Sequence, residues 1–224
     1  MDFSNIFNFN WSTIPFQLIA FVIAFSLHEW AHAYVAYLLE DNTAKHEGRL
    51  TVNPIPHIDP FGLILILFGP FGWAKPVPVN PSNFRGNKRL GMVYVAAAGP
   101  LVNIVLAVFF GCLLGITINE GWLIGLSDKW ATAINMTLQL CIQINIGLFV
   151  FNLLPIPPLD GSKIFRYLSP RRWGGFFEKL ELYGPWILLL IIFISPLKIL
   201  LFYPFYYVFI FVEDIVNAFL RVIY

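Results

Sequence analysis

Long apolar stretches dominate the pattern of hydrophobic and polar positions along the chain. Four of them reach or exceed the ~20 residues that a helix needs to cross a bilayer. They run from about Ile14 to Leu39, from Met92 to Ile118, from Ala131 to Leu154 and from Tyr183 to Phe211. Breaks at Pro196 and Pro204 favour two spans in the C-terminal region, within about residues 183–223. The pattern therefore predicts an all-α integral membrane protein, built as a bundle of about five transmembrane helices.

A shorter apolar segment, Phe61 to Trp73, is too short to cross the membrane at about 13 residues. Its internal glycines and proline favour a re-entrant or interfacial hairpin. Lys75 to Phe84 follows with three prolines, which bias the backbone towards an extended conformation. We expect a re-entrant or extended element near residues 61–84. It either accepts a substrate strand by edge pairing or simply connects the hairpin to the next span.

The composition supports a membrane environment and a single domain. Of the 224 residues, 58% are hydrophobic and 12% are charged, whereas roughly 25% of an average soluble domain is charged. Because the predicted helices use so much of the chain, we expect one membrane-embedded domain over residues 1–224. The net charge of +1 does not favour nucleic acid as a partner. The lipid bilayer is the expected surrounding.

Basic residues are unevenly distributed and predict an orientation. Eleven of the 14 Lys and Arg residues lie in three connecting regions, at 45–49, 75–89 and 163–179. The positive-inside rule places all three regions on the cytoplasmic side. The loop at 117–130 holds two acidic residues and one lysine, as an outside loop would. We therefore expect the N-terminus outside the membrane.

The first apolar stretch contains the sequence His28-Glu29-Trp30-Ala31-His32, which has the pattern H-E-x-x-H. On a helix, residues four apart lie on the same face, so the two imidazoles can share one metal ion. Ionisable residues within a membrane span are costly and are functional by default. This pattern predicts zinc bound by His28 and His32, with Glu29 as the general base that activates water.

A catalytic zinc takes three protein ligands and keeps a fourth position for water. Asp160 lies near the end of the proline-rich run from Asn152 to Gly161, at the cytoplasmic end of the third long span. The prolines of this run prevent a regular helix, and broken backbone at membrane depth must face protein or a wet cavity. Asp160 is therefore the expected third ligand. Zinc-dependent hydrolysis of peptide bonds, by a metalloendopeptidase, is the expected reaction.

These residues resemble the site-2 protease family of intramembrane zinc metalloproteases, in which an H-E-x-x-H helix is paired with a later N-x-x-P-x-P-x-x-D-G segment. Both patterns are complete here, at residues 28–32 and 152–161. The likeness extends to Asn53 to Pro60, Phe71 to Asn80 and Ala98 to Asn103. It covers roughly residues 20–165 of the chain.

This resemblance implies a catalytic core of three transmembrane helices, at about residues 12–165, with one zinc per chain below the cytoplasmic face. The C-terminal transmembrane helices, at about 183–223, would lie outside that core. The resemblance also implies membrane-spanning protein substrates, cut within or near their transmembrane helices in regulated intramembrane proteolysis. The sequence differs from many members of that family, because it is expected to be a compact form without a PDZ or CBS domain. A bacterial cytoplasmic membrane is the expected location.

Two further polar residues, His57 and Asn152, are expected near the metal as donors to the oxyanion or to the substrate backbone. An interfacial loop histidine and a helix-end contact are the alternatives for these two. Asn103, within the second long span, is expected to bond across helices. For the whole chain, the alternative is a zinc transporter or a zinc-binding scaffold without peptidase activity. Transport, however, needs sites leading across the membrane, and these ligands cluster at one depth.

Overall fold

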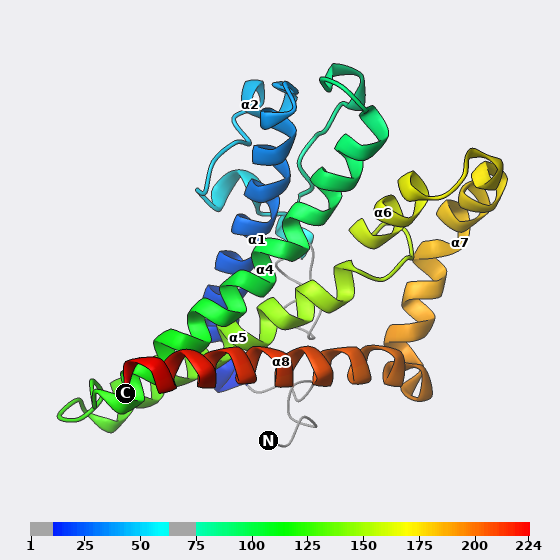
Figure 1. Ribbon diagram of the computed structural model, residues 1–224. Coiled ribbons are helices and arrows are strands. Elements are labelled where there is room, and N and C mark those ends of the chain that lie inside the picture. The colour runs from blue at the N-terminus through cyan, green and yellow to red at the C-terminus, as the bar shows by residue number, and fades with distance from the viewer. Residues whose placement is uncertain (1–10, 63–74) are drawn as a thin grey trace.

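The computed structural model describes residues 11–62 and 75–224, and its regular structure is helical (Figure 1). Within the described residues, four helical stretches are long and apolar enough to cross a membrane. They are α1 (Ile14–Leu38), α4 (Lys88–Asn119), α5 (Asp128–Asn152) and the stretch Pro196–Ile223, which contains α8 (Ile199–Ile223). The prediction of an all-α membrane protein is confirmed.

Helices α1, α4 and α5 form a central unit, because each of them contacts the other two. Small residues are buried in this unit, among them Ala20 and Ala24 of α1 and Ala107 of α4. Small side chains let helix backbones approach closely inside a membrane, where van der Waals packing and hydrogen bonds drive association. This arrangement is the three-helix core that the family resemblance implied.

Helix α8 packs along α4 and α5, on a surface that two glycines of α4 leave open (Figure 1). A methyl group added at Gly111 would lie 2.7 Å from Val216, and one added at Gly115 would lie 2.4 Å from Leu220. The missing side chains therefore make the groove that receives two apolar residues of α8.

Helix α7 (Gly174–Phe193) is not among these candidate spans, so four helices of the described residues are long and apolar enough to cross, where about five were predicted. Its first half contains Glu178, Lys179 and Glu181, and only the part from Leu182 to Phe193 is free of charge. That part is shorter than the ~20 residues a span requires. The turn η6 (Ser195–Lys198) then leads into α8.

The remaining elements are short. They are η2 (Trp11–Thr13), α2 (Thr43–His46), η3 (Ile55–His57), η4 (Pro81–Asn83), α6 (Asp160–Leu168) and η5 (Arg171–Trp173). Most of the predicted hairpin at 61–73 lies outside the described residues. The following residues, 75–80, contain no helix, as the prolines predicted. Helices α2 and α6 and the segment 75–84 lie at the end of the bundle where α1 ends and α4 begins.

Candidate metal centre

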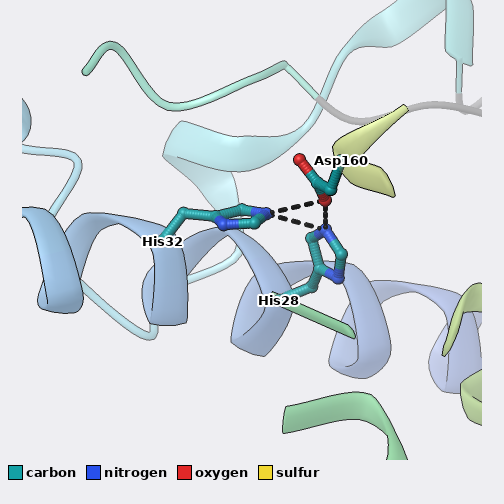
Figure 2. Close-up of side chains that lie close together, drawn as sticks. All are labelled: His28, His32 and Asp160. Carbon is teal, nitrogen blue, oxygen red and sulfur yellow. Dashed lines mark hydrogen bonds and ion pairs between the residues drawn. The ribbon is translucent and has the colours of Figure 1, made fainter. Parts of the chain in front are cut away.

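Two histidines one turn apart on α1 point to the same place. His28 and His32 are both buried, and their Nε2 atoms lie 3.0 Å apart (Figure 2). Residues four apart lie on the same helix face, so the helix alone is sufficient to bring the two rings together. Both side chains belong to the C-terminal half of α1.

Asp160 reaches the same place from the start of α6 (Figure 2). Its Oδ2 lies 3.2 Å from His28 Nε2 and 3.1 Å from His32 Nε2. The position of α6 depends on Gly161, where a methyl group would lie 2.3 Å from the carbonyl oxygen of Leu153. Close packing of the start of α6 against Leu153, the residue after α5, therefore brings together the three residues that were predicted to bind zinc.

The three atoms are spaced much as the ligands of a tetrahedral zinc would be. Zinc binds histidine nitrogen and carboxylate oxygen at about 2.0–2.2 Å, which puts neighbouring ligand atoms of a regular tetrahedron about 3.3–3.6 Å apart. The observed separations of 3.0, 3.1 and 3.2 Å are slightly shorter. Two imidazole nitrogens and one carboxylate oxygen are also a donor set that zinc uses. The residues present therefore fit a zinc ion.

Gly99 of α4 leaves room beside the two histidines. A methyl group added at Gly99 would lie 2.5 Å from His32 Nε2 and 2.6 Å from His28 Nε2. These are the same nitrogen atoms that converge on Asp160. The backbone of α4 thus approaches the side of both rings that faces Asp160, and any side chain there would fill the space beside the three residues.

The outward nitrogen of each histidine meets an oxygen of α4. His28 Nδ1 lies 2.6 Å from Asn103 Oδ1, and His32 Nδ1 lies 2.6 Å from the carbonyl oxygen of Val95. Partners of this kind orient ligating imidazoles. Asn103 does bond across helices, as predicted, but its contact with His28 was not foreseen. The only sign of this contact in the sequence was the polar amide of Asn103 within an apolar span.

Lys163 holds the second oxygen of the Asp160 carboxylate. Its Nζ donates to Asp160 Oδ1 at 3.0 Å, one turn along α6. The ammonium belongs to a half-exposed side chain, whereas the carboxylate is buried. The two oxygens of Asp160 therefore face different partners, and Oδ2 alone faces the histidines.

Glu29 is buried and contacts the segment 75–80. Its Oε2 accepts a hydrogen bond from the backbone N–H of Val77 at 2.8 Å. Glu29 comes between the two histidines in the chain, but this contact joins it to a residue 48 positions away. The segment 75–80 therefore passes directly beside the predicted general base.

Three further contacts hold the segment 75–80 in place. The backbone N–H of Lys75 donates to the carbonyl oxygen of His57 at 2.9 Å. Arg49 donates from Nη2 to the Lys75 carbonyl at 2.5 Å. The N–H of Asn80 donates to Asp41 Oδ2 at 2.7 Å. The loop after α1 thus fixes both ends of the segment.

Asp41 is a buried anchor for these connections. Its carboxylate accepts hydrogen bonds from the Thr43 backbone and hydroxyl, from the Asn80 N–H and from the Asn83 side chain. Burial by itself raises the pKa of Asp41, but the hydrogen bonds, led by that of the Thr43 hydroxyl, hold this pKa below its usual value. The loop therefore stabilises Asp41 in its charged form.

His57 and Asn152 make other contacts. His57 is buried, and its Nε2 lies 2.8 Å from the carbonyl oxygen of Thr51. The Asn152 side chain donates to the carbonyl oxygen of Leu148, one turn earlier in α5. These contacts do not include the three clustered residues. A role for either residue as donor to the oxyanion or substrate stays a prediction.

Comparison with known proteins adds independent information. Residues 114–192 match the family described as "Peptidase family M50". The chain is 43% identical over 193 residues to "Putative zinc metalloprotease YwhC" of Bacillus subtilis (strain 168), covering 86% of each protein. It is 28% identical over 173 residues to "Putative zinc metalloprotease Rip2" of Mycolicibacterium smegmatis (strain ATCC 700084 / mc(2)155), covering 71% of this chain and 62% of that protein. No solved structure is significantly similar.

Proposed function

The chain belongs to peptidase family M50, the site-2 protease family, and on that premise we propose that His28, His32 and Asp160 hold the zinc and that Glu29 is the general base. Family and relatives make the protein an integral membrane zinc metalloendopeptidase. The observation that carries the residue assignment is the convergence of three electron-pair donors within 3.2 Å of one another. The transporter and scaffold alternatives gain no support from the relatives.

The proposed mechanism assigns the proton transfers to Glu29. When bound, zinc lowers the pKa of a coordinated water to about 7 and polarises the peptide carbonyl. The Val77 N–H orients one oxygen of Glu29, so that the carboxylate is held in place to accept the proton of the attacking water. The same carboxyl group then returns that proton to the departing amine.

The proposed substrates are membrane-spanning proteins, and the segment 75–80 supports a way of holding them. A transmembrane helix must unwind before attack, because each carbonyl is hydrogen-bonded within the helix. Along an extended chain, Val77 and Val79 present their backbone groups to the same side, and Val77 faces Glu29. Because the Val77 N–H is already bonded to Glu29, an unwound substrate strand beside the base would pair with the Val77 carbonyl and with Val79.

We also propose that residues 1–224 act as one membrane-embedded domain with the metal centre towards the cytoplasm and the N-terminus outside. The basic residues of the connecting regions support this orientation. Lys45, Arg85, Lys88 and Lys163 lie in the connections and helix ends at the metal-centre end of the bundle. The loop between α4 and α5, with Glu120, lies at the opposite end. The positive-inside rule then places the metal centre towards the cytoplasm.

Glu29→Gln tests the assignment, because glutamine keeps the size of the side chain and cannot act as a base. The variant and the wild type are reconstituted with a panel of single-span membrane proteins, and products are identified by mass spectrometry. We expect unchanged zinc content and turnover lower by ~100-fold or more. Cleavage by the variant at the wild-type rate would refute the role of Glu29. Zinc binding by a wild type that cleaves no member of the panel would favour the scaffold alternative.

A further inference from the structure

A chain of buried amides connects His28 to the third helix of the core. Asn103 of α4 and Asn145 of α5 are both completely buried. The Asn103 side-chain nitrogen donates to Asn145 Oδ1 at 2.8 Å and to the carbonyl oxygen of Ala24 at 3.3 Å. The Asn145 side-chain nitrogen donates to the carbonyl oxygen of Cys141 at 2.8 Å. One polar path thus joins α1, α4 and α5 in the apolar interior.

The direction of every hydrogen bond in this path follows from its last member. The Cys141 carbonyl can only accept, so Asn145 must present its NH₂ group to it and its oxygen to Asn103. Asn103 must then present its NH₂ group to Asn145 and its oxygen to His28. An amide oxygen can only accept, so His28 Nδ1 must carry the hydrogen. Reversing either amide would leave buried groups unpaired, at about 1–3 kcal/mol each.

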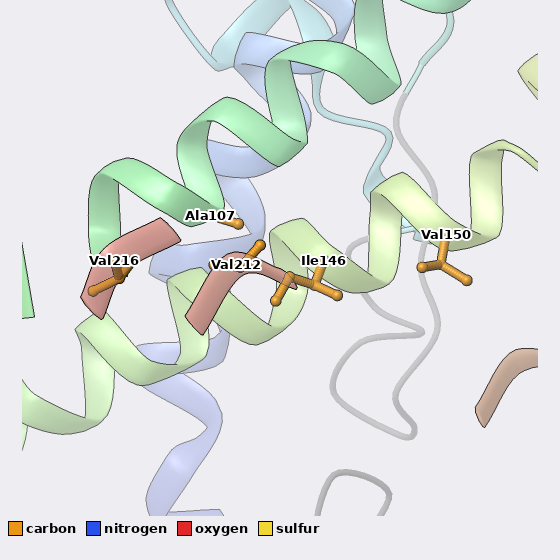
Figure 3. Close-up of a cluster of buried hydrophobic side chains, with 5 residues drawn as sticks. All are labelled: Ala107, Ile146, Val150, Val212 and Val216. Atoms are coloured by element: carbon orange, nitrogen blue, oxygen red, sulfur yellow. The ribbon is translucent and has the colours of Figure 1, made fainter. Parts of the chain in front are cut away.

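An apolar cluster packs next to the two asparagines and helps to fix their positions. Ile146, next to Asn145, is fully buried in a cluster with Ala107, Val212 and Val216 (Figure 3). Ala107 lies one turn beyond Asn103 on α4, and the two valines belong to α8. In Figure 3, these side chains come from three helices, α4, α5 and α8, and lie close together. The positions of the amides are therefore set by the helix packing as well as by their hydrogen bonds.

From this geometry we infer that Asn103 and Asn145 are positioning residues that set the tautomer of His28. With the hydrogen on Nδ1, a neutral imidazole has its free electron pair on Nε2, which is the atom that faces His32 and Asp160. Asn145 acts through Asn103 and contacts none of the proposed ligands. The inference rests on the proposed zinc site for its consequence, but the hydrogen on Nδ1 follows from the hydrogen bonds of the protein itself.

The first test reads the tautomer directly. Protein with ¹⁵N-labelled histidine is freed of metal in detergent. The His28 signals are identified by their loss in His28→Gln. We expect the nitrogen shift of a protonated Nδ1, because the Asn103 oxygen that faces it can only accept a hydrogen bond. The opposite tautomer in the wild type would overturn the inference, whatever the protein does with zinc.

The second test measures the zinc dissociation constant by competition with a chelator. Asn103→Leu should weaken binding by about 10–100-fold and Asn145→Leu by about 10-fold. Asn103→Asp keeps an oxygen that accepts from Nδ1 but loses the donor to Asn145 and Ala24, so it should weaken binding less than Asn103→Leu does. Asn135→Leu is the matched control on α5, since the side-chain oxygen of Asn135 accepts a hydrogen bond from Gln139 of the same helix. Alanine replaces leucine wherever a leucine variant does not fold.

The outcomes separate this inference from the proposed function. If Asn103→Leu and Asn145→Leu bind zinc as tightly as Asn135→Leu does, the positioning role is wrong. If Asn145→Leu alone matches the control, the path ends at Asn103 and the role of Asn145 is wrong. If the wild type binds zinc no more tightly than a His28→Ala/His32→Ala variant, the proposed metal site fails, while the nitrogen shifts still decide the tautomer.

Discussion

Replacing Gly99 by alanine is expected to abolish zinc binding while the helices remain folded. The added methyl carbon would lie 2.5 Å from His32 Nε2 and 2.6 Å from His28 Nε2. Ordinary contact between a carbon and another heavy atom needs about 3.5 Å, so the rings and the α4 backbone must separate by about 1 Å. Metal–ligand bonds tolerate about 0.2 Å. A displacement of this size therefore removes two of the three proposed ligands.

The expected effect is a zinc affinity more than ~100-fold weaker, beyond the 10–100-fold loss typical of changes in groups that only orient ligands. The measurement is zinc per protein by mass spectrometry, followed by chelator competition, with helicity measured by circular dichroism. Gly147→Ala is the matched control in α5, because a methyl group there would meet only Phe205, at 4.0 Å. Alanine otherwise favours a helix over glycine by about 1 kcal/mol, so the control should be at least as stable as the wild type.

Full zinc occupancy in folded Gly99→Ala would refute this reasoning. It would mean that the metal lies away from the face that α4 presents to the two histidines. Loss of zinc in both glycine variants would instead point to a general effect on helix packing. Loss in Gly99→Ala alone supports the close approach of α4 to the site.

Two further predictions follow from single contacts. Asp160→Ala should lower the zinc content as sharply as the His28→Ala/His32→Ala double substitution does. The measurement is zinc per protein in detergent. Retention of zinc by Asp160→Ala would mean that the third ligand is another residue. Asp41→Asn should lower the free energy of unfolding near neutral pH by about 1–3 kcal/mol, because buried hydrogen bonds to a carboxylate are lost. Since folding lowers the pKa of Asp41, its contribution is complete above the unfolded value of about 3.9 and is lost as the pH falls through the folded value. The unfolding temperatures of wild type and Asp41→Asn should therefore converge below about pH 4, and a constant difference would contradict this assignment.

The local sequence pattern was sufficient to predict part of the candidate site. The spacing of His28 and His32 lies within one helical turn, so any helix over that sequence puts both rings on one face. The lengths of the apolar segments predicted which helices are long enough to cross a membrane. Helix α7 is the exception, because charged residues occupy its first half. Asp160 could be chosen because acids are scarce near the membrane and its proline-rich run cannot form a regular helix.

Contacts between distant segments could not be derived in this way. The Val77 N–H on Glu29 and the Asn80 N–H on Asp41 join residues about 40 to 50 positions apart, on a connection with no periodic pattern. The sequence indicates only that Gly99 belongs to an apolar span. The structure shows that α4 lies against the histidine rings at this residue. Helix periodicity predicts which residues share a face, but it does not indicate which neighbouring helix covers that face.

The sequence by itself determined the membrane environment, the long helices and the identity of four candidate residues at the metal centre. Those features depend on segment length and on spacing within one turn, which are local properties of the chain. Only the tertiary structure decided that Asn103 and Asn145 link His28 to α5, that Gly99 clears the space beside both rings and that Val77 holds Glu29. These contacts depend on the rotation and depth at which helices pack, and small residues and buried hydrogen bonds spread over the whole chain set that packing jointly.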